Sequence, residues 1–162
     1  MPTTHVDHLE RARDAAGRLV AALLERELSL AIAESLTGGL ASHLVVDRPD
    51  SGQVHLGAVV AYDSAVKQRV LGVSDGPVVT GRCAQEMAAG VQRLIGARCA
   101  LAFTGVAGPA TQEGCAVGTV FIAARADERA TVLARHYTGD PDEIRAQAVA
   151  DGAALLCGLV HP

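Results

Sequence analysis

Apolar residues recur every three or four positions between residues 6 and 26, and charged residues lie on the other side of this pattern. The apolar stripe includes Leu9, Ala12, Ala16, Leu19 and Leu23. This spacing matches the 3.6-residue period of a helix with one buried side. The sequence therefore predicts an amphipathic first helix.

Short, nearly unbroken apolar runs alternate with further helical patterns along the rest of the chain. The runs predict strands over 28–33, 54–62, 98–104, 117–124 and 131–137. The helical patterns predict helices over 40–46, 80–95 and 141–159, with a short helix around Lys67. Asp63 or Ser64 is suited to cap the short helix, and Asp140, which precedes Pro141, is suited to cap the last one.

Strands that alternate with helices and are apolar on both faces indicate a sheet covered on both sides. The sequence therefore predicts an α/β fold, a three-layer α/β/α sandwich. A short polar segment, 125–129, joins the last two predicted strands and favours an antiparallel hairpin, so we expect a mixed, mostly parallel sheet. A length of 162 residues suits one sizeable core, and we expect a single domain over residues 1–162.

Composition excludes several classes of function. The net charge of -4, two Phe, two Tyr and no Trp provide neither the basic surface nor the stacking groups of nucleic-acid binding, so we expect no nucleic-acid partner. No apolar stretch is long enough for a membrane span, and the N-terminal segment is acidic, so we expect no membrane partner and a cytoplasmic location. The four cysteines and six histidines lack metal-ligand spacing, so we expect reduced thiols and no metal site.

The segment AESLTGG, residues 33–39, places Ser35 between a predicted strand and a predicted helix. The first N–H groups of a helix are unpaired and carry the positive end of its dipole, which stabilises an oxyanion. Gly38 and Gly39 allow a substrate to approach the backbone closely. The structural alternative is that Ser35 or Thr37 caps the helix and that the glycines form a tight turn.

Two further segments follow strands that are expected to end at the same edge of the sheet. YDSAVK supplies Lys67, which can act as the base for a serine only if its surroundings keep it neutral; the alternative is a solvated helix residue. TGVAGP follows the third strand, where α/β sheets bind ligands, unless it is a plain connection. This loop has neither the dinucleotide-binding nor the P-loop glycine pattern.

Together with AVGTV from Ala116 and GDPDEIR from Gly139, these segments resemble the motifs of the CinA (competence/damage-inducible protein A) C-terminal domain family. The family motifs read AESCTGG, YSNxxK, TGIAGP or SGIAGP, KPVGTV and GDRxxVR. The resemblance keeps this order and extends over residues 10–159. Family members often carry an additional N-terminal domain, and by resemblance we expect the stand-alone form and a homo-oligomer.

The resemblance implies a serine amidohydrolase that deamidates nicotinamide mononucleotide to nicotinic acid mononucleotide and ammonia, without a cofactor. Ser35 would be the nucleophile, Lys67 its general base and Tyr62 a proton relay or orienting group. Amides of residues 37–39 would stabilise the oxyanion, and an arginine of the last helix would hold the phosphate. The residues implied in binding this small-molecule nucleotide are Thr37, Gly38, Gly39, Thr104, Gly105, Gly108 and Arg145.

The chain departs from the family motifs at three places. Leu36 replaces a cysteine, Pro141 replaces the arginine of the GDR segment, and ATQEGCA over 110–116 replaces a Gly-Gly pair followed by Lys-Pro. The change in the loop restricts the backbone and removes a positive charge. A second hypothesis therefore stays open, a catalytically degenerate relative that binds a ligand or serves assembly. A third is a serine amidohydrolase that acts on another amide.

Overall fold

The computed structural model describes residues 7–161, so Val6 at the start of the first predicted helix lies outside the described residues. The elements in chain order are α1 (His8–Glu25), β1 (Leu30–Glu34), α2 (Leu40–Val46), the 3-10 helix η1 (Ser51–Gln53), β2 (His55–Val60), α3 (Ser64–Leu71), α4 (Gly81–Ile95), β3 (Cys99–Gly105), β4 (Thr119–Ala126), β5 (Arg129–His136) and α5 (Pro141–Val160).

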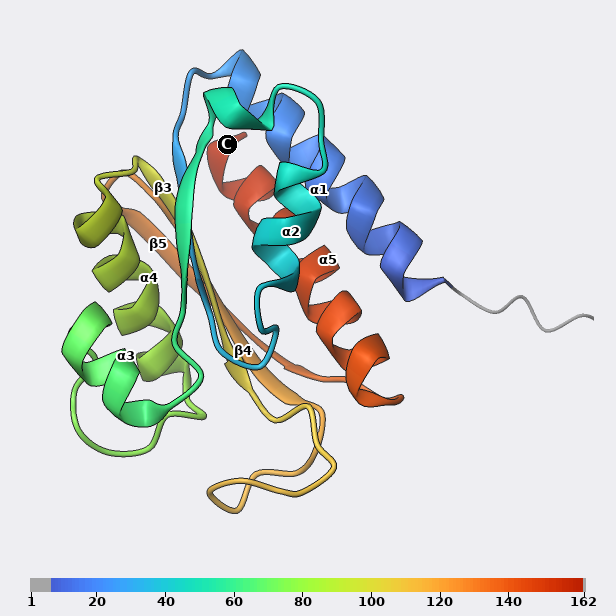
Figure 1. The fold of residues 1–162 in the computed structure, drawn as a ribbon, viewed down its shortest axis with the longest axis vertical. Helices are drawn as coiled ribbons and strands as arrows, with labels where there is room; N and C mark the ends of the chain where they lie inside the picture. The colour runs from blue at the N-terminus through green and yellow to red at the C-terminus, as the bar shows by residue number, and fades with distance from the viewer. Residues whose placement is uncertain (1–6, 162) are drawn as a thin grey trace, which may run out of the picture.

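The strands form one five-stranded sheet in the order β2-β1-β3-β4-β5. β1 pairs in parallel with β2 and β3, whereas β4 runs antiparallel to both β3 and β5. Figure 1 shows α3 and α4 on one side of this sheet and α1, α2 and α5 on the other. The predicted three-layer α/β/α sandwich with a mixed, mostly parallel sheet is confirmed.

The central strand β1 explains why the sheet is covered on both faces. All five of its residues are buried. Leu30 and Ile32 belong to the apolar cluster beneath α1, α2 and α5, while Ala31 and Ala33 belong to the cluster beneath α3 and α4. Because successive strand residues point to opposite faces, one short apolar run supplies both halves of the core.

Side-chain caps fix where several helices begin. Of the two predicted caps of α3, Asp63 is the one observed, and its carboxylate accepts the N–H of Ala65 at 2.8 Å. Asp140 caps α5 as predicted, in a reciprocal capping box with Glu143. These caps compensate the unpaired amides of each first turn.

The last hairpin differs from the prediction in its boundaries. The polar segment 125–129 was expected to be the turn, but Arg125 pairs with Ala130 within the strands, so that only Asp127 and Glu128 make the turn. Arg125 can belong to β4 because its guanidinium Nε donates to Gln92 Oε1 of α4 at 2.7 Å. A charged residue therefore occurs inside a strand where a neighbouring helix offers it a partner.

Close contact between α3 and α4 sets the position of α3, which carries Lys67. A Cβ atom at Gly90 would clash with the backbone carbonyl of Leu71, whose carbon would lie at 2.8 Å. We expect Gly90→Ala to lower the free energy of unfolding by about 3 kcal/mol, because backbone atoms cannot move aside as a flexible side chain can. Urea unfolding measures this change.

Gly158→Ala in α5 is the matched control, because a Cβ there has open space. We expect it to leave the free energy of unfolding unchanged or to raise it by up to about 1 kcal/mol. Equal stability of the two variants would contradict the close approach of α3 and α4.

Candidate active site

A cavity of about 450 Å³ lies where the parallel strands β1, β2 and β3 end. Its volume is within the range of small-molecule sites. The segments that follow these strands, the segment before α4 and one residue of α5 form its walls. The lining residues are Ser35, Leu36, Tyr62, Asp63, Ser64, Lys67, Val78, Val79, the run 104–112 and Arg145.

Lys67 is the only lysine in the sequence, and its side chain is buried in the wall of this cavity. The residue is 2% exposed, and its Nζ donates to the carbonyl oxygen of Tyr62 at 3.1 Å. Burial lowers the pKa of Lys67 below its ordinary value of 10.5, and the nearby Cys83, Asp63 and Glu113 oppose this shift only in part. The alternative of a solvated helix residue is therefore wrong, and the amine is biased toward the neutral form that a base requires.

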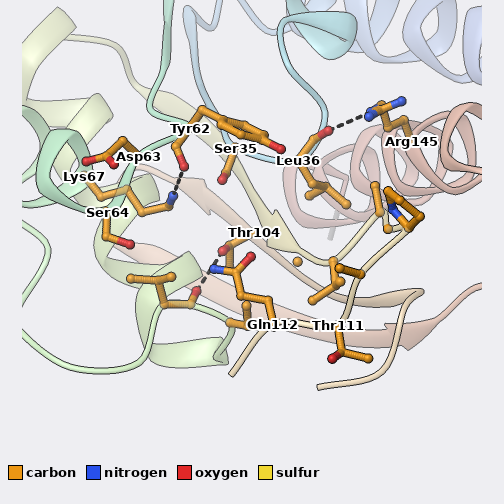
Figure 2. Close-up of a pocket in the computed structure, with 18 residues that line it drawn as sticks. Ser35, Leu36, Tyr62, Asp63, Ser64, Lys67, Thr104, Thr111, Gln112 and Arg145 are labelled. Carbon is orange, nitrogen blue, oxygen red and sulfur yellow. Dashed lines mark hydrogen bonds between the residues drawn. The ribbon is translucent and has the colours of Figure 1, made fainter. Parts of the chain in front are cut away.

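Ser35 comes directly after β1 and is 7% exposed. Its N–H donates to the carbonyl of Phe103 at 3.1 Å, which fixes the turn to β3. In Figure 2 its hydroxyl and the Lys67 amine both point into the cavity below Tyr62. Within residues 7–161 the hydroxyl has no hydrogen-bond partner, and α2 has Gly39 as its N-cap without a side-chain cap. A cap of α2 by Ser35 or Thr37 is therefore not observed within residues 7–161, whereas the tight turn of that alternative is, since Gly38 and Gly39 both have positive φ.

Glu34 is a site residue that the sequence analysis missed. It is fully buried, and its carboxylate accepts the N–H groups of Ala41 at 2.9 Å and Ser42 at 3.0 Å, in the first turn of α2. Its backbone carbonyl accepts the N–H of Ala61 at 2.8 Å, one residue before Tyr62. One residue thus joins the strand that carries Ser35 to α2 and to the end of β2. The sequence signal was an ionisable residue that ends an otherwise apolar run.

The binding residues predicted between β1 and α2 lie outside the cavity lining. Thr37 is 2% exposed, the N–H of Gly38 donates to the carbonyl of Ser35 at 3.0 Å, and Gly39 adopts a left-handed conformation at the start of α2. The expectation of unpaired amides in the first turn of α2 is wrong for two of them, because Glu34 accepts both. The positive end of this helix is already compensated by a fixed carboxylate.

Backbone amides on two other segments are free to meet a ligand. Leu36, Ala107 and Gly108 line the cavity, and their N–H groups have no acceptor among residues 7–161. Leu36 follows Ser35 directly, whereas Ala107 and Gly108 follow β3. An N–H next to the nucleophile together with one from a neighbouring loop is a common source of oxyanion stabilisation.

Tyr62 and Arg145 enclose the site from opposite sides. The Tyr62 residue is 74% exposed, and its contact with Lys67 is made by the backbone carbonyl. Arg145 extends from α5, where its Nε donates to the carbonyl of Leu36 at 2.9 Å and its Nη1 to Asp142 Oδ1 at 2.9 Å. Figure 2 shows this guanidinium beside Leu36. Arg145 therefore brings a positive charge to the turn that follows the serine.

Thr104, Gly105 and Gly108 lie in the cavity lining, as the sequence predicts. Thr104 is 1% exposed, and its hydroxyl donates to the carbonyl of Val78 at 2.7 Å. The structure thus brings Ser35, Lys67 and the loop after β3 into one cavity. It places residues 37–39 outside that lining.

The model of the family described as the CinA C-terminal domain matches residues 12–160. The chain belongs to the CinA C-terminal domain family. It is 40% identical over 138 residues to a competence-damage inducible protein of Bacillus velezensis, covering 82% of this chain and 33% of that protein. It is 37% identical over 145 residues to a CinA-like protein of Frankia casuarinae, covering 86% and 34%. The chain spans about a third of the length of these curated relatives.

Solved structures of the CinA superfamily share this fold. A superfamily protein from Klebsiella pneumoniae superimposes with a TM-score of 0.89 at 31% identity, covering 93% of this chain and 98% of that one. A competence/damage inducible protein from Agrobacterium tumefaciens superimposes with a TM-score of 0.87 at 27% identity, covering 92% and 95%. The expected single domain and homo-oligomer of this CinA chain stay predictions.

Residues 7–161 contain no group of three or more His, Cys, Asp or Glu side chains placed to hold a metal ion. In the same part of the CinA chain, no helix has the length and apolar character needed to cross a membrane.

Removal of the Glu34 carboxylate tests its role in this CinA site. We expect Glu34→Ala to lower the free energy of unfolding by about 3 kcal/mol, because the buried N–H of Ala41 and the part-buried N–H of Ser42 lose their carboxylate acceptor. Glu128→Ala removes an exposed carboxylate of the hairpin turn and is expected to change the free energy of unfolding by less than about 0.5 kcal/mol. Urea unfolding of both variants measures the difference, and wild-type stability of Glu34→Ala would contradict this role.

Proposed function

We propose that this CinA domain hydrolyses the carboxamide of nicotinamide mononucleotide, releasing ammonia and nicotinic acid mononucleotide. One observation carries the proposal: the only lysine of the chain is buried, with a lowered pKa, in the lining of the same cavity as a serine hydroxyl that has no hydrogen-bond partner among residues 7–161. A serine and a neutral lysine are a known pairing of nucleophile and base. Family membership supports a CinA-like role, and the site chemistry supports an amidohydrolase.

In the proposed reaction Ser35 Oγ attacks the carboxamide carbon while Lys67 Nζ takes the hydroxyl proton. The tetrahedral intermediate collapses as the proton passes from Lys67 to the leaving nitrogen, so that ammonia departs and an acyl-serine remains. A water molecule then attacks the acyl carbon and gives its proton to Lys67, which returns it to Ser35 Oγ as the acid is released. In each half of the reaction Lys67 thus accepts a proton once and donates it once.

We propose that the N–H of Leu36, together with that of Ala107 or Gly108, donates hydrogen bonds to the oxyanion of the tetrahedral intermediate. These groups line the cavity and are unpaired among residues 7–161, which supports the assignment over residues 37–39. One such donor contributes roughly 3 to 4 kcal/mol to transition-state stabilisation in well-studied enzymes.

We propose that Arg145 binds the phosphate of the substrate. It is the one arginine among the described residues that line the cavity. Its contacts with Leu36 and Asp142 fix the guanidinium plane while leaving further donors for phosphate oxygens. Thr104, Gly105 and Gly108 form the adjoining wall. For Tyr62 we propose an orienting role, because its carbonyl holds the base.

Ammonia release from nicotinamide mononucleotide by the purified protein tests the function. We expect Ser35→Ala and Lys67→Met each to lower kcat by at least about 10³-fold. Lys67→Met is expected to be as stable as the wild-type protein or more so, because an apolar chain of similar length replaces a buried amine. Full turnover in either variant would contradict the mechanism.

The pH dependence of kcat/KM tests the ionisation of the base. Lys67 accepts a proton only when neutral, so the rate is expected to rise with pH and to level off above the pKa of the folded protein. Because burial lowers the pKa of Lys67, this plateau begins below pH 10.5. Rates of ammonia release between about pH 6 and about pH 10 measure the profile. A rate that falls over this range would rule out a neutral lysine base.

A second candidate is a ligand-binding relative without turnover. It is favoured by the hydrogen bond of Lys67 Nζ, which goes to the Tyr62 carbonyl rather than to Ser35, and by the divergent loop 110–116. Binding of nicotinamide mononucleotide by the wild-type protein without ammonia release would support this candidate over the hydrolase.

A further inference from the structure

The divergent loop ends in a turn that places a glutamate in an unfavourable backbone conformation. Glu113 has a φ of 54° and Gly114 a φ of 73°, and Gln112 and Cys115 pair across them. Two left-handed residues in succession form a turn that usually contains Asn-Gly or Asp-Gly, since a long side chain is disfavoured there. Glu113 therefore occupies a position that its backbone conformation alone does not favour.

Contacts of the Glu113 side chain explain its presence in this turn. Its carboxylate accepts the N–H of Val78 at 2.9 and 3.1 Å and the N–H of Val79 at 2.9 Å. The same segment receives the Thr104 hydroxyl on the carbonyl of Val78. The end of β3, through Thr104, and the loop that follows it, through Glu113, are thus both fastened to the segment before α4. Both segments line the cavity, so this fastening builds one of its walls.

Gln112 directly precedes Glu113 and presents its side chain to the cavity. Figure 2 shows its carboxamide pointing inward, toward Thr104. Its backbone is held by exchanged hydrogen bonds with Cys115 at 3.3 and 2.8 Å. Gln112 is exposed, and the turn that fixes its backbone next to Glu113 is what places its side chain at the cavity.

We propose that Glu113 is a positioning residue of the substrate site and that Gln112 is the specificity-determining residue it positions. This inference rests on the proposed function. In it the Gln112 side chain hydrogen-bonds the carboxamide of the substrate, which is the group that reacts. A glutamine carboxamide offers one donor and one acceptor, which complement the acceptor and donor of a primary carboxamide. A carboxylate product offers acceptors alone, so one of the two hydrogen bonds is lost. Gln112 therefore favours the amide substrate over its acid product.

Binding measured without turnover tests the inference separately from the function. In a Ser35→Ala background, calorimetry gives the Kd of nicotinamide mononucleotide and that of nicotinic acid mononucleotide. We expect Gln112→Ala to reduce the preference for the amide by about tenfold. We expect Glu113→Ala to weaken binding of the amide by about tenfold, and Glu113→Gln, which keeps one acceptor, to weaken it less. Glu128→Ala, also an exposed turn carboxylate, is the control and leaves both Kd values unchanged.

Hydrogen exchange gives a readout that does not depend on any ligand. The amides of Val78 and Val79 are expected to exchange faster in Glu113→Ala than in the wild-type protein, with intermediate rates in Glu113→Gln. In the proposed hydrolase, Glu113→Ala is expected to raise KM for nicotinamide mononucleotide and Glu113→Gln to raise it less, because the wall that carries Gln112 is loosened.

The outcomes separate the two claims. A wild-type protein that binds the mononucleotide without releasing ammonia contradicts the hydrolase, and the variants then still decide the roles of Gln112 and Glu113. An unchanged amide preference in Gln112→Ala, or an unchanged Kd in Glu113→Ala, overturns the inference. Absence of binding by the Ser35→Ala protein overturns it as well.

Discussion

The proposed chemistry of this site depends on the burial of a single amine, that of Lys67. Removing a lysine ammonium from water is unfavourable unless several acceptors surround it. Lys67 has one hydrogen-bond acceptor among residues 7–161, the carbonyl of Tyr62. Burial with so little compensation favours the neutral amine, which is why the pKa of Lys67 is lowered. The other strongly basic side chains of the sequence are arginines, which remain charged under almost all conditions.

The elements around this amine are arranged by backbone contacts. Asp63 begins α3, the close approach at Gly90 sets α3 against α4, and Glu34 joins the end of β1 to α2 and to β2. Glu34 also compensates the positive end of α2. The loops after β1 and β3 therefore have to supply any oxyanion donors. Elements fixed by these contacts thus place Ser35 and Lys67 at the cavity, while loops complete its lining.

Much of the fold was predictable because it depends on local periodicity. The apolar runs and the capping residues Asp63 and Asp140 are visible within a few positions of the sequence. The placement of Ser35 and Lys67 at one cavity was also predictable, because parallel strands end at the same edge of the sheet. Glu34 and Glu113 were missed because their roles depend on which backbone amides their carboxylates contact in the folded chain. Glu113 bonds amides 34 and 35 positions away, and no periodic pattern predicts such a contact. The hairpin boundary was wrong because the partner of Arg125 lies on another element.

Direct titration of the single lysine tests the central claim. Lysine labelled with ¹³C at Cε gives one side-chain signal in this protein, and its chemical shift against pH, measured by NMR, reports the pKa of Lys67. The structure predicts a pKa below the ordinary 10.5, returning toward that value when the protein is unfolded in urea. A folded-state pKa at or above 10.5 would contradict the effect of burial on Lys67 and the mechanism that uses its neutral form as the base.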